Sequence, residues 1–346
     1  MSVVSDPVFS LASDNYAPVH PEVLAAITAA NQGHSRPYGD DAVTPAAVAA
    51  MRGELGANAE IAFVFNGTGA NVVGLQLLLR PWQHVICART AHIAVDECGA
   101  IERIVGAKLA LVDTPEGKLT PELIRAAHVR IGDQHATQPG AVSISQSTEY
   151  GTVYSVPELR EISEVVHELG MYLHLDGSRI ANATAALGIP LSESTAGVDV
   201  LSFGGTKNGL LGAEAVVVFN PELHGQIPFV RKQFMQLGSK GRFLAAQFLA
   251  LFTDQLWLRN ASNANAMAAR LHQGLAELPG FKITQARQAN HVFAVVPAEI
   301  IEPLQQVSPF YVWDESIGEI RLLASWDTTA EQVDLFLATA RELTAV

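Results

Sequence analysis

The chain has 346 residues, of which 49% are hydrophobic and 16% are charged. This apolar content excludes a chain that stays disordered for want of a core, and the length allows one large domain or two. A formal net charge of −13 provides no basic patch that could neutralise a nucleic-acid backbone. Small molecules are therefore the expected partners.

The N-terminal segment and the cysteines bear on location. Residues 1–20 contain no Lys or Arg and no uninterrupted apolar stretch, unlike a secretory signal peptide. No apolar run approaches the ~18 residues that a membrane span needs. Two cysteines, Cys87 and Cys98, suit a reducing compartment better than a disulfide framework. We expect a cytoplasmic protein that does not enter a membrane.

From about residue 60, short apolar runs typical of strands alternate with longer segments typical of helices. The strand-like runs are 61–65, 84–88, 107–113, 141–145, 171–176, 198–203 and 213–219. Thr120 before Pro121, and Ser155 three residues before Glu158, mark two helix starts between them. The alternation predicts an α/β fold with a mostly parallel sheet flanked by helices.

After about residue 222 this alternation stops. Residues 238–278 carry apolar residues at three- and four-residue spacing, which predicts helices able to bridge two domains. Strand-like runs at 291–296 and 319–325 and a closing helix at 329–346 predict a smaller α+β domain. We expect an N-terminal arm over 1–20, a large domain over 21–235, and a bridging helix with a small C-terminal domain over 236–346.

The segment NGTGAN at 66–71 follows a strand and begins a helix. The backbone N–H groups of Gly67, Thr68, Gly69 and Ala70 would point outward at the positive helix end, where a phosphate binds well. The glycine spacing of a dinucleotide site and the lysine of a P-loop are both missing. An ordinary glycine-rich turn before a helix is the alternative.

The segment LHLDGSRIANA ends a predicted strand with Asp176. Ligands of α/β proteins bind at this end of parallel strands. Asp176 could simply cap the next helix, but Arg179 would then lack a partner. A carboxylate paired with a protonated ring nitrogen, and an arginine that fixes an anionic oxygen, would account for both residues.

The segment SFGGTKNG contains Lys207, the only charge between Asp199 and Glu214. Its glycines would let a planar ligand lie close to the backbone, and apolar surroundings would lower the pKa of its amine toward the nucleophilic form. The alternative is a lysine in a tight turn that points at water.

Together the three segments supply what pyridoxal 5'-phosphate needs: an anion seat, a carboxylate for its pyridine nitrogen and an amine for its aldehyde. We therefore expect this cofactor. The motifs that carry a resemblance are SDN at 13–15, PYGDD at 37–41, NGTGAN at 66–71, AHIAVDECGA at 91–100, HLDGSRIANA at 174–183 and SFGGTKNGLLGAE at 202–214. Over nearly its whole length the chain resembles the L-threonine aldolases, including low-specificity and phenylserine-type members, of the aspartate aminotransferase-like (fold-type I) class.

The resemblance implies roles around the cofactor. Lys207 would bind its aldehyde, Asp176 its pyridine nitrogen, and the Gly67–Gly69 turn its phosphate. His92 matches a histidine that stacks on the ring, although a helix-end histidine bonded to backbone is the alternative. Arg179 matches an arginine that contacts the cofactor hydroxyl or the substrate.

The resemblance also implies substrate contacts. Arg321, in the smaller domain, matches an arginine that grips the substrate carboxylate, which would place the site between domains. Ser13 and Asp14 fall where the family's N-terminal segment approaches the substrate. Glu149 stands where many members carry a histidine near the substrate hydroxyl. The general base is therefore open between Glu149, a water that it holds, and His92.

Members of the resembled family form homotetramers, dimers of dimers with shared sites, in which a neighbour's basic residues bind phosphate. Lys240 and Arg242 are candidate counterparts, or ordinary surface charges, and Tyr38 is a candidate contact at the same place. The implied reaction is retro-aldol cleavage of L-threonine, L-allo-threonine or another β-hydroxy-α-amino acid, including phenylserine, to glycine and an aldehyde. A β-eliminating lyase, an aminotransferase and a non-catalytic nucleotide-binding protein are the alternatives.

Overall fold

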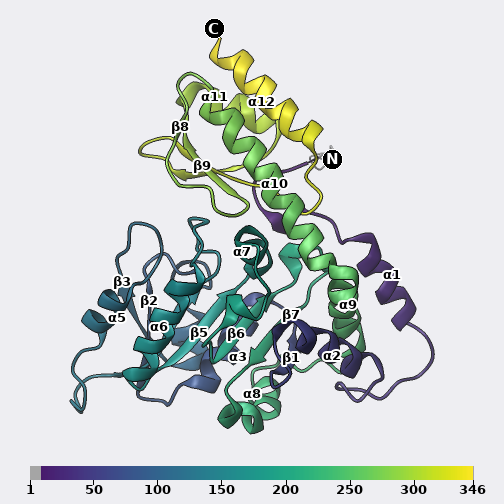
Figure 1. Ribbon diagram of the computed structural model, residues 1–346, viewed down its shortest axis with the longest axis vertical. Helices are drawn as coiled ribbons and strands as arrows, with labels where there is room; N and C mark the ends of the chain where they lie inside the picture. The colour runs from purple at the N-terminus through teal and green to yellow at the C-terminus, as the bar shows by residue number, and fades with distance from the viewer. Residues whose placement is uncertain (1–8, 346) are drawn as a thin grey trace, which may run out of the picture.

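Two β-sheets organise the chain, and the long helix α10 (Leu256–Ala276) runs from the larger to the smaller (Figure 1). The computed structural model describes residues 9–345. Residues 1–8 of the predicted N-terminal arm and Val346 of the predicted closing helix lie outside the described residues.

Within the described residues the larger sheet has seven strands, in the order β1-β7-β6-β5-β4-β2-β3. These are β1 (Glu60–Val64), β2 (Gln83–Ala88), β3 (Lys108–Val112), β4 (Gln138–Ser145), β5 (Tyr172–Gly177), β6 (Val200–Gly204) and β7 (Glu214–Val218). β3, β2, β4, β5 and β6 are parallel, and β7 is antiparallel to both β6 and β1. The predicted mostly parallel sheet is confirmed.

Helices cover both faces of this sheet because side chains alternate between its faces along every strand. The helices of this part are α1 (Pro21–Ala30), α2 (Val43–Leu55), α3 (Gly67–Leu78), α4 (His92–Val95), α5 (Pro121–Ala127), α6 (Val156–Glu168), α7 (Ile180–Leu187), α8 (Ile227–Gln233) and α9 (Arg242–Phe252). Phe63 and Phe203 lie in the core shared with α1, α2, α5, α6 and α9. Val64 and Val200 lie in the opposite core, with α3 and α8.

The predicted helix starts are also confirmed. Thr120 caps α5 with Pro121 behind it, and Ser155 and Glu158 form both halves of a capping box at α6. These signals are readable because a cap satisfies backbone N–H groups of the same helix and depends on no distant contact.

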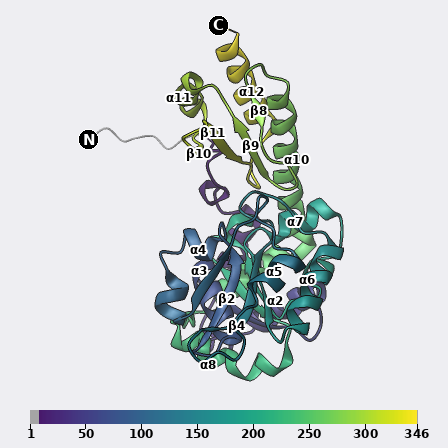
Figure 2. The same ribbon diagram turned by 90° about the vertical axis from the view of Figure 1, so that its left-hand side faces the viewer.

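The small domain places a four-stranded antiparallel sheet against helices (Figure 2). Its elements are β8 (Lys282–Ile283), β9 (His291–Val295), α11 (Ala298–Val307), β10 (Tyr311–Asp314), β11 (Glu319–Leu323) and α12 (Ala330–Thr344). Val292 and Ile320 face the helical core. The predicted α+β character is confirmed. The predictions missed β8 and β10, because β8 has two residues and β10 is partly exposed along its whole length.

The predicted helical region 238–278 is interrupted at Thr253–Gln255, where Asp254 (φ 47°) and Gln255 (φ 52°) adopt left-handed backbone. α9 therefore packs with α1 and α2 in the large domain, while α10 packs with α7 and α12. The predicted boundaries at residues 20 and 235 remain predictions. In residues 9–345, no helix combines the length and apolar character needed to cross a bilayer.

Candidate active site

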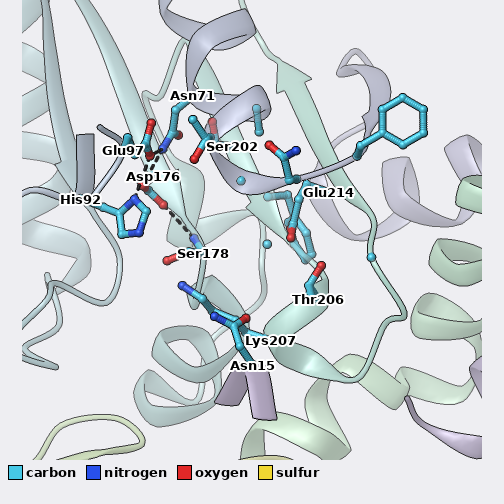
Figure 3. Close-up of a pocket in the computed structure, with 18 residues that line it drawn as sticks. Asn15, Asn71, His92, Glu97, Asp176, Ser178, Ser202, Thr206, Lys207 and Glu214 are labelled. Carbon is cyan, nitrogen blue, oxygen red and sulfur yellow. Dashed lines mark hydrogen bonds and ion pairs between the residues drawn. The ribbon is translucent and has the colours of Figure 1, made fainter. Parts of the chain in front are cut away.

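A cavity of about 310 Å³ lies at the carboxyl ends of β5 and β6 (Figure 3). The segments that meet there include the N-terminal turn at Asn15, the turn after β1 with the first turns of α3, α4 with Glu97 after it, the end of β5, the end of β6 with its turn, and the start of β7. Its polar lining residues are Asn15, Asn66, Thr68, Asn71, His92, Glu97, Asp176, Ser178, Ser202, Thr206, Lys207 and Glu214. The topology thus brings the three predicted segments to one place.

Asp176 ends β5 and is buried with both carboxylate oxygens engaged. Oδ2 accepts a hydrogen bond from Asn71 Nδ2 (3.0 Å) and Oδ1 accepts one from the backbone N–H of Ser178 (3.0 Å). Burial opposes its ionisation, but the nearby charge of His92 and the Asn71 hydrogen bond outweigh burial and hold the pKa of Asp176 below its usual value. Asp176 is therefore ionised at neutral pH.

His92 begins α4 and reaches the same network. Its Nδ1 lies 2.8 Å from Glu97 Oε1, and the same oxygen accepts from Asn71 Nδ2 (2.7 Å). The hydrogen bond to Glu97 raises the pKa of His92, against the effect of burial. The sequence analysis gave Asn71 and Glu97 no role although both stand inside quoted motifs. Asn71 has a signal in the sequence, a polar side chain in an otherwise apolar buried helix, whereas Glu97 stands among exposed residues and has none.

Lys207 lies in a short turn, Thr206–Asn208, directly after β6. Burial lowers the pKa of its amine, and the charge of Arg179 adds to the effect. Two of the neighbouring glycines also have a packing role. A Cβ on Gly204 would lie 2.4 Å from the carbonyl oxygen of Ser178, and one on Gly205 would lie 2.4 Å from the side chain of Leu210. These two glycines permit close packing of the protein on itself, and Gly204 also borders the cavity, so the expected room for a planar ligand remains a prediction.

The expected anion seat begins α3. Gly67 and Thr68 line the cavity, and a Cβ on Gly67 would meet nothing within 4 Å among the described residues. The N–H of Gly69 donates to the capping side chain of Asn66 (2.7 Å) and Gly69 does not border the cavity. In this chain the part of the anion seat that a phosphate can reach from the cavity is therefore the turn at Gly67 and Thr68.

Asp14 and Arg179 form a buried bidentate ion pair. Nε and the Nη2 atom of Arg179 lie 2.7 and 2.9 Å from the two oxygens of Asp14. Burial disfavours the charged form of Asp14, but the Arg179 guanidinium prevails and lowers the pKa to about 2. The sequence analysis named both residues but did not pair them, because 165 positions separate them.

Arg321 lies on β11 of the small domain and does not border the described cavity, although the charges of Arg179 and Asp14 act on it. Its guanidinium lies 5.5 Å from the centre of the Tyr311 ring and 4.9 Å from that of the nearer Trp313 ring, both on β10. Its Nε is buried without a hydrogen-bond partner among the described residues. The same holds for both ring nitrogens of His291, which the sequence analysis missed and whose pKa burial places well below its usual value. This region keeps polar groups unpaired, as a binding site does.

Known proteins share both the sequence and the fold. The family model of the beta-eliminating lyases matches residues 10–299. The low specificity L-threonine aldolase of Pseudomonas aeruginosa is 43% identical over 336 residues, which cover 95% of this chain and 96% of that protein.

The chain belongs to the beta-eliminating lyase family.

Structural comparison agrees with this membership. A threonine aldolase from Leishmania major superposes with a TM-score of 0.93 at 30% identity, covering 97% of this chain and 99% of that one. An aspartate aminotransferase from Thermus thermophilus, at 17% identity, has a TM-score of 0.68 over 94% of this chain and 89% of that one, and shows the fold alone. The resemblance to threonine aldolases and the aminotransferase-like fold are both confirmed.

Members of this lyase family depend on pyridoxal 5'-phosphate. The residues present fit that cofactor: an open helix start for a phosphate, an ionised buried carboxylate at Asp176, and at Lys207 an amine of lowered pKa border one cavity. The expected cofactor is confirmed.

Glu149, the candidate base of this lyase, lies behind His92. Its Oε1 accepts from the backbone N–H of His92 (2.9 Å) and from the Ser145 hydroxyl (2.8 Å). Burial raises its pKa, although the Ser145 hydrogen bond opposes the shift. Glu149 does not border the cavity, whereas His92 does.

The remaining predicted contacts lie outside the described cavity. Ser13 caps the turn Asp14–Tyr16 by accepting from the N–H of Asn15 (3.2 Å). The ring of Tyr38 is half exposed, and Arg242 donates to the carbonyl oxygens of residues 32 and 33 in its own chain. Lys240 is exposed. None of these four borders the described cavity.

Proposed function

We propose that this lyase cleaves β-hydroxy-α-amino acids between Cα and Cβ, with L-threonine and L-allo-threonine as substrates that yield glycine and acetaldehyde, and phenylserine as an aromatic relative. The observation that carries the proposal is the meeting of Lys207 and Asp176 in one cavity. The names of the Pseudomonas aeruginosa and Leishmania major relatives supply the reaction. Nothing specific to this chain favours β-elimination or transamination over it.

When bound, pyridoxal phosphate supplies an electron sink for breaking the Cα–Cβ bond. We assign Lys207 to the cofactor aldehyde, Asp176 to its pyridine nitrogen and the turn at Gly67 to its phosphate. His92 is assigned to the ring and, because it borders the cavity, to removal of the β-hydroxyl proton. Glu149 then acts as a positioning residue that holds the backbone of His92 in place.

For the substrate carboxylate we assign Arg321 and Arg179. The unpaired buried Nε of Arg321 supports the first assignment. The pairing with Asp14 orients Arg179 and prevents it from being an unmatched buried charge. In this proposal a large domain over 21–235 holds the cofactor, and the segment over 236–346, a bridging helix and a small domain, supplies Arg321 for the substrate.

We also propose a cytoplasmic homotetramer with shared sites. Among the described residues bordering the cavity, Lys207 is the only Lys or Arg, so the phosphate lacks a cation that a neighbour's Lys240 or Arg242 would supply. Gln236 accepts from the N–H of Phe65 (3.0 Å), beside the seat. The next residue, Leu237, lines a surface hollow with Tyr38 and Phe229, so a second copy on this hollow would approach the seat.

The function is tested with L-threonine and the cofactor-loaded protein, with glycine and acetaldehyde measured as products. We expect both products in equal amounts. Lys207→Ala should abolish turnover, and Asp176→Ala should reduce it by about 10³-fold or more, because a neutral pyridine nitrogen withdraws electrons poorly. A keto acid or ammonia as product would indicate transamination or elimination. A protein that stays colourless with added pyridoxal phosphate would refute the cofactor assignment as well.

A further inference from the structure

A buried carboxylate, Glu214, lies between the anion seat and the lysine turn. It begins β7, where it is paired in register with Val64 at the end of β1 and with Gly204 at the end of β6. The chain passes from Val64 into the seat and from Gly204 into the turn that carries Lys207. Glu214 therefore borders the same cavity as both (Figure 3).

Glu214 holds the lysine turn by a direct contact. Its Oε2 accepts a hydrogen bond from the backbone N–H of Gly205 at 2.5 Å. Gly205 immediately precedes the turn Thr206–Asn208, so this contact fixes the path of the backbone leading to Lys207. Only 6% of Glu214 is exposed. The carboxyl group is a built part of the site and not a surface charge that happens to lie nearby.

A carboxylate is an unfavourable neighbour for a phosphate. Two like charges in a cavity of low dielectric repel strongly, and one of the two groups is relieved by taking up a proton. The other titratable groups that border the described cavity are Lys207, His92, Glu97 and Asp176. Of these, Lys207 faces Glu214 closely enough to favour its ionisation. Burial acts against that charge and raises the pKa of Glu214 to about 7.

We propose that Glu214 takes up one proton from solvent when a phosphate group enters the seat, so that cofactor binding and protonation of Glu214 are linked. The neutral carboxyl still accepts from the N–H of Gly205, and the lysine turn keeps its position. Glu214 is thus a positioning residue whose charge sets the pH range in which the phosphate binds. The inference rests on the cofactor, and it is independent of which amino acid is cleaved.

The test uses the cofactor-free protein and inorganic phosphate, measured by titration calorimetry between about pH 6 and about pH 9 in buffers of different ionisation enthalpy. We compare wild type with Glu214→Gln, which keeps an acceptor for Gly205 but cannot ionise. Above its pKa of about 7, the protonated fraction of Glu214 falls about tenfold for each pH unit. Wild type should therefore bind phosphate about tenfold more weakly than Glu214→Gln at about pH 8 and about a hundredfold more weakly at about pH 9.

Proton uptake gives a second, direct readout. Wild type should take up close to one proton more per bound phosphate than Glu214→Gln at about pH 8. The ionisation of inorganic phosphate itself is common to both proteins and cancels in the comparison. Lys207 interacts with Glu214, so its titration is measured separately in both proteins without phosphate. Glu319→Gln removes a buried carboxylate of the small domain that does not border the described cavity, and this control should behave as wild type.

Two results would overturn the proposal. One is equal proton uptake by wild type and Glu214→Gln; the other is an affinity gain in Glu214→Gln that does not change with pH, which would show that Glu214 stays ionised beside the phosphate. If circular dichroism shows that Glu214→Gln is unfolded, the wild type alone still tests the proposal. Phosphate binding by wild type without proton uptake above about pH 7 would overturn it. A titration with pyridoxal phosphate, followed by its visible absorption, and acetaldehyde release by wild type test the proposed function separately.

Discussion

At the scale of single residues, the site is a chain of hydrogen bonds between ionisable groups. Glu97 links His92 to Asn71, and Asn71 links Glu97 to Asp176. Each member limits the charge and orientation of the next, and two buried oxygens, Asn71 Oδ1 and Glu97 Oε2, have no hydrogen-bond partner among the described residues. The hydrogen bond to Glu97 and the ionised Asp176 raise the pKa of His92, which acts as a base only in its neutral form.

The role of Glu149 can be separated from that of a base at this scale. Glu149→Gln retains an oxygen that can accept from the N–H of His92, whereas Glu149→Ala does not. We expect Glu149→Gln to keep threonine cleavage within about tenfold of wild type and Glu149→Ala to lose about a hundredfold, since removal of the acceptor leaves a buried donor unpaired. The pH profile of kcat in Glu149→Gln should keep its shape. A loss as large as that of Glu149→Ala, with a flattened profile, would identify Glu149 as the base.

At the scale of elements, strand ends and the turns after them build the site. The end of β6 passes so close to the turn after β5 that a side chain at Gly204 has no room beside Ser178. This close approach brings the segment that carries Asp176 and the segment that carries Lys207 to the same cavity. Gly204 of the SFGGTKNG segment therefore determines how these strand ends pack, at a place that also borders the cavity.

Gly204→Ala tests this packing. The added methyl group should shift the two turns apart and lower the free energy of unfolding by about 1–3 kcal/mol. Threonine cleavage should also fall under conditions in which the variant is still folded, because the shift moves Lys207 and Asp176 relative to one another. Gly53→Ala is the control, because Gly53 lies in α2 with nothing within 4 Å of its Cβ position, and it should stabilise by up to about 1 kcal/mol. Urea unfolding and acetaldehyde release measure the two effects. If Gly204→Ala and Gly53→Ala had the same unfolding free energy and the same rate of acetaldehyde release, close packing at Gly204 would not be what positions these turns.

At the scale of the whole molecule, our proposal draws on both domains and on more than one copy of the chain. Tyr150 of the large domain packs edge-on against Phe293 and Trp313 of the small domain, with ring centres 6.0 Å apart in both pairs. This contact holds the sheet that carries Arg321 over the cavity side of the large domain. On another part of the surface, Phe229 is 74% exposed and Met235 is 77% exposed. Such apolar exposure is typical of an interface.

Phe229→Glu tests assembly. With a charge in the hollow, the variant should sediment as smaller species than wild type. Loss of the neighbour's cation should also weaken its binding of pyridoxal phosphate by about tenfold or more. Leu335→Glu, on α12 and 54% exposed, makes the same charge change outside this hollow and should alter neither quantity. A wild-type monomer with full cofactor affinity would refute the shared site.

Much of this protein can be predicted from local pattern. The strands of the large sheet and the caps at Thr120 and Ser155 are readable because burial periodicity and capping involve neighbours along the chain. Lys207 and Asp176 are readable because an isolated charge among glycines and a carboxylate at a strand end contradict their surroundings. The break between α9 and α10 is not readable in this way, since nothing in the apolar spacing marks residues 254 and 255 as left-handed.

The contacts that make a site depend on segments far apart in the chain. The pairing of Asp14 with Arg179, the approach of Arg321 and the position of Glu214 between two turns follow from how strands and domains pack. Residue chemistry and spacing carry no information on which distant segment will arrive, because packing selects partners over the whole chain at once. The motifs of this lyase thus specify which reactive residues are present. The charged groups that shift their pKa values become neighbours only when the chain folds.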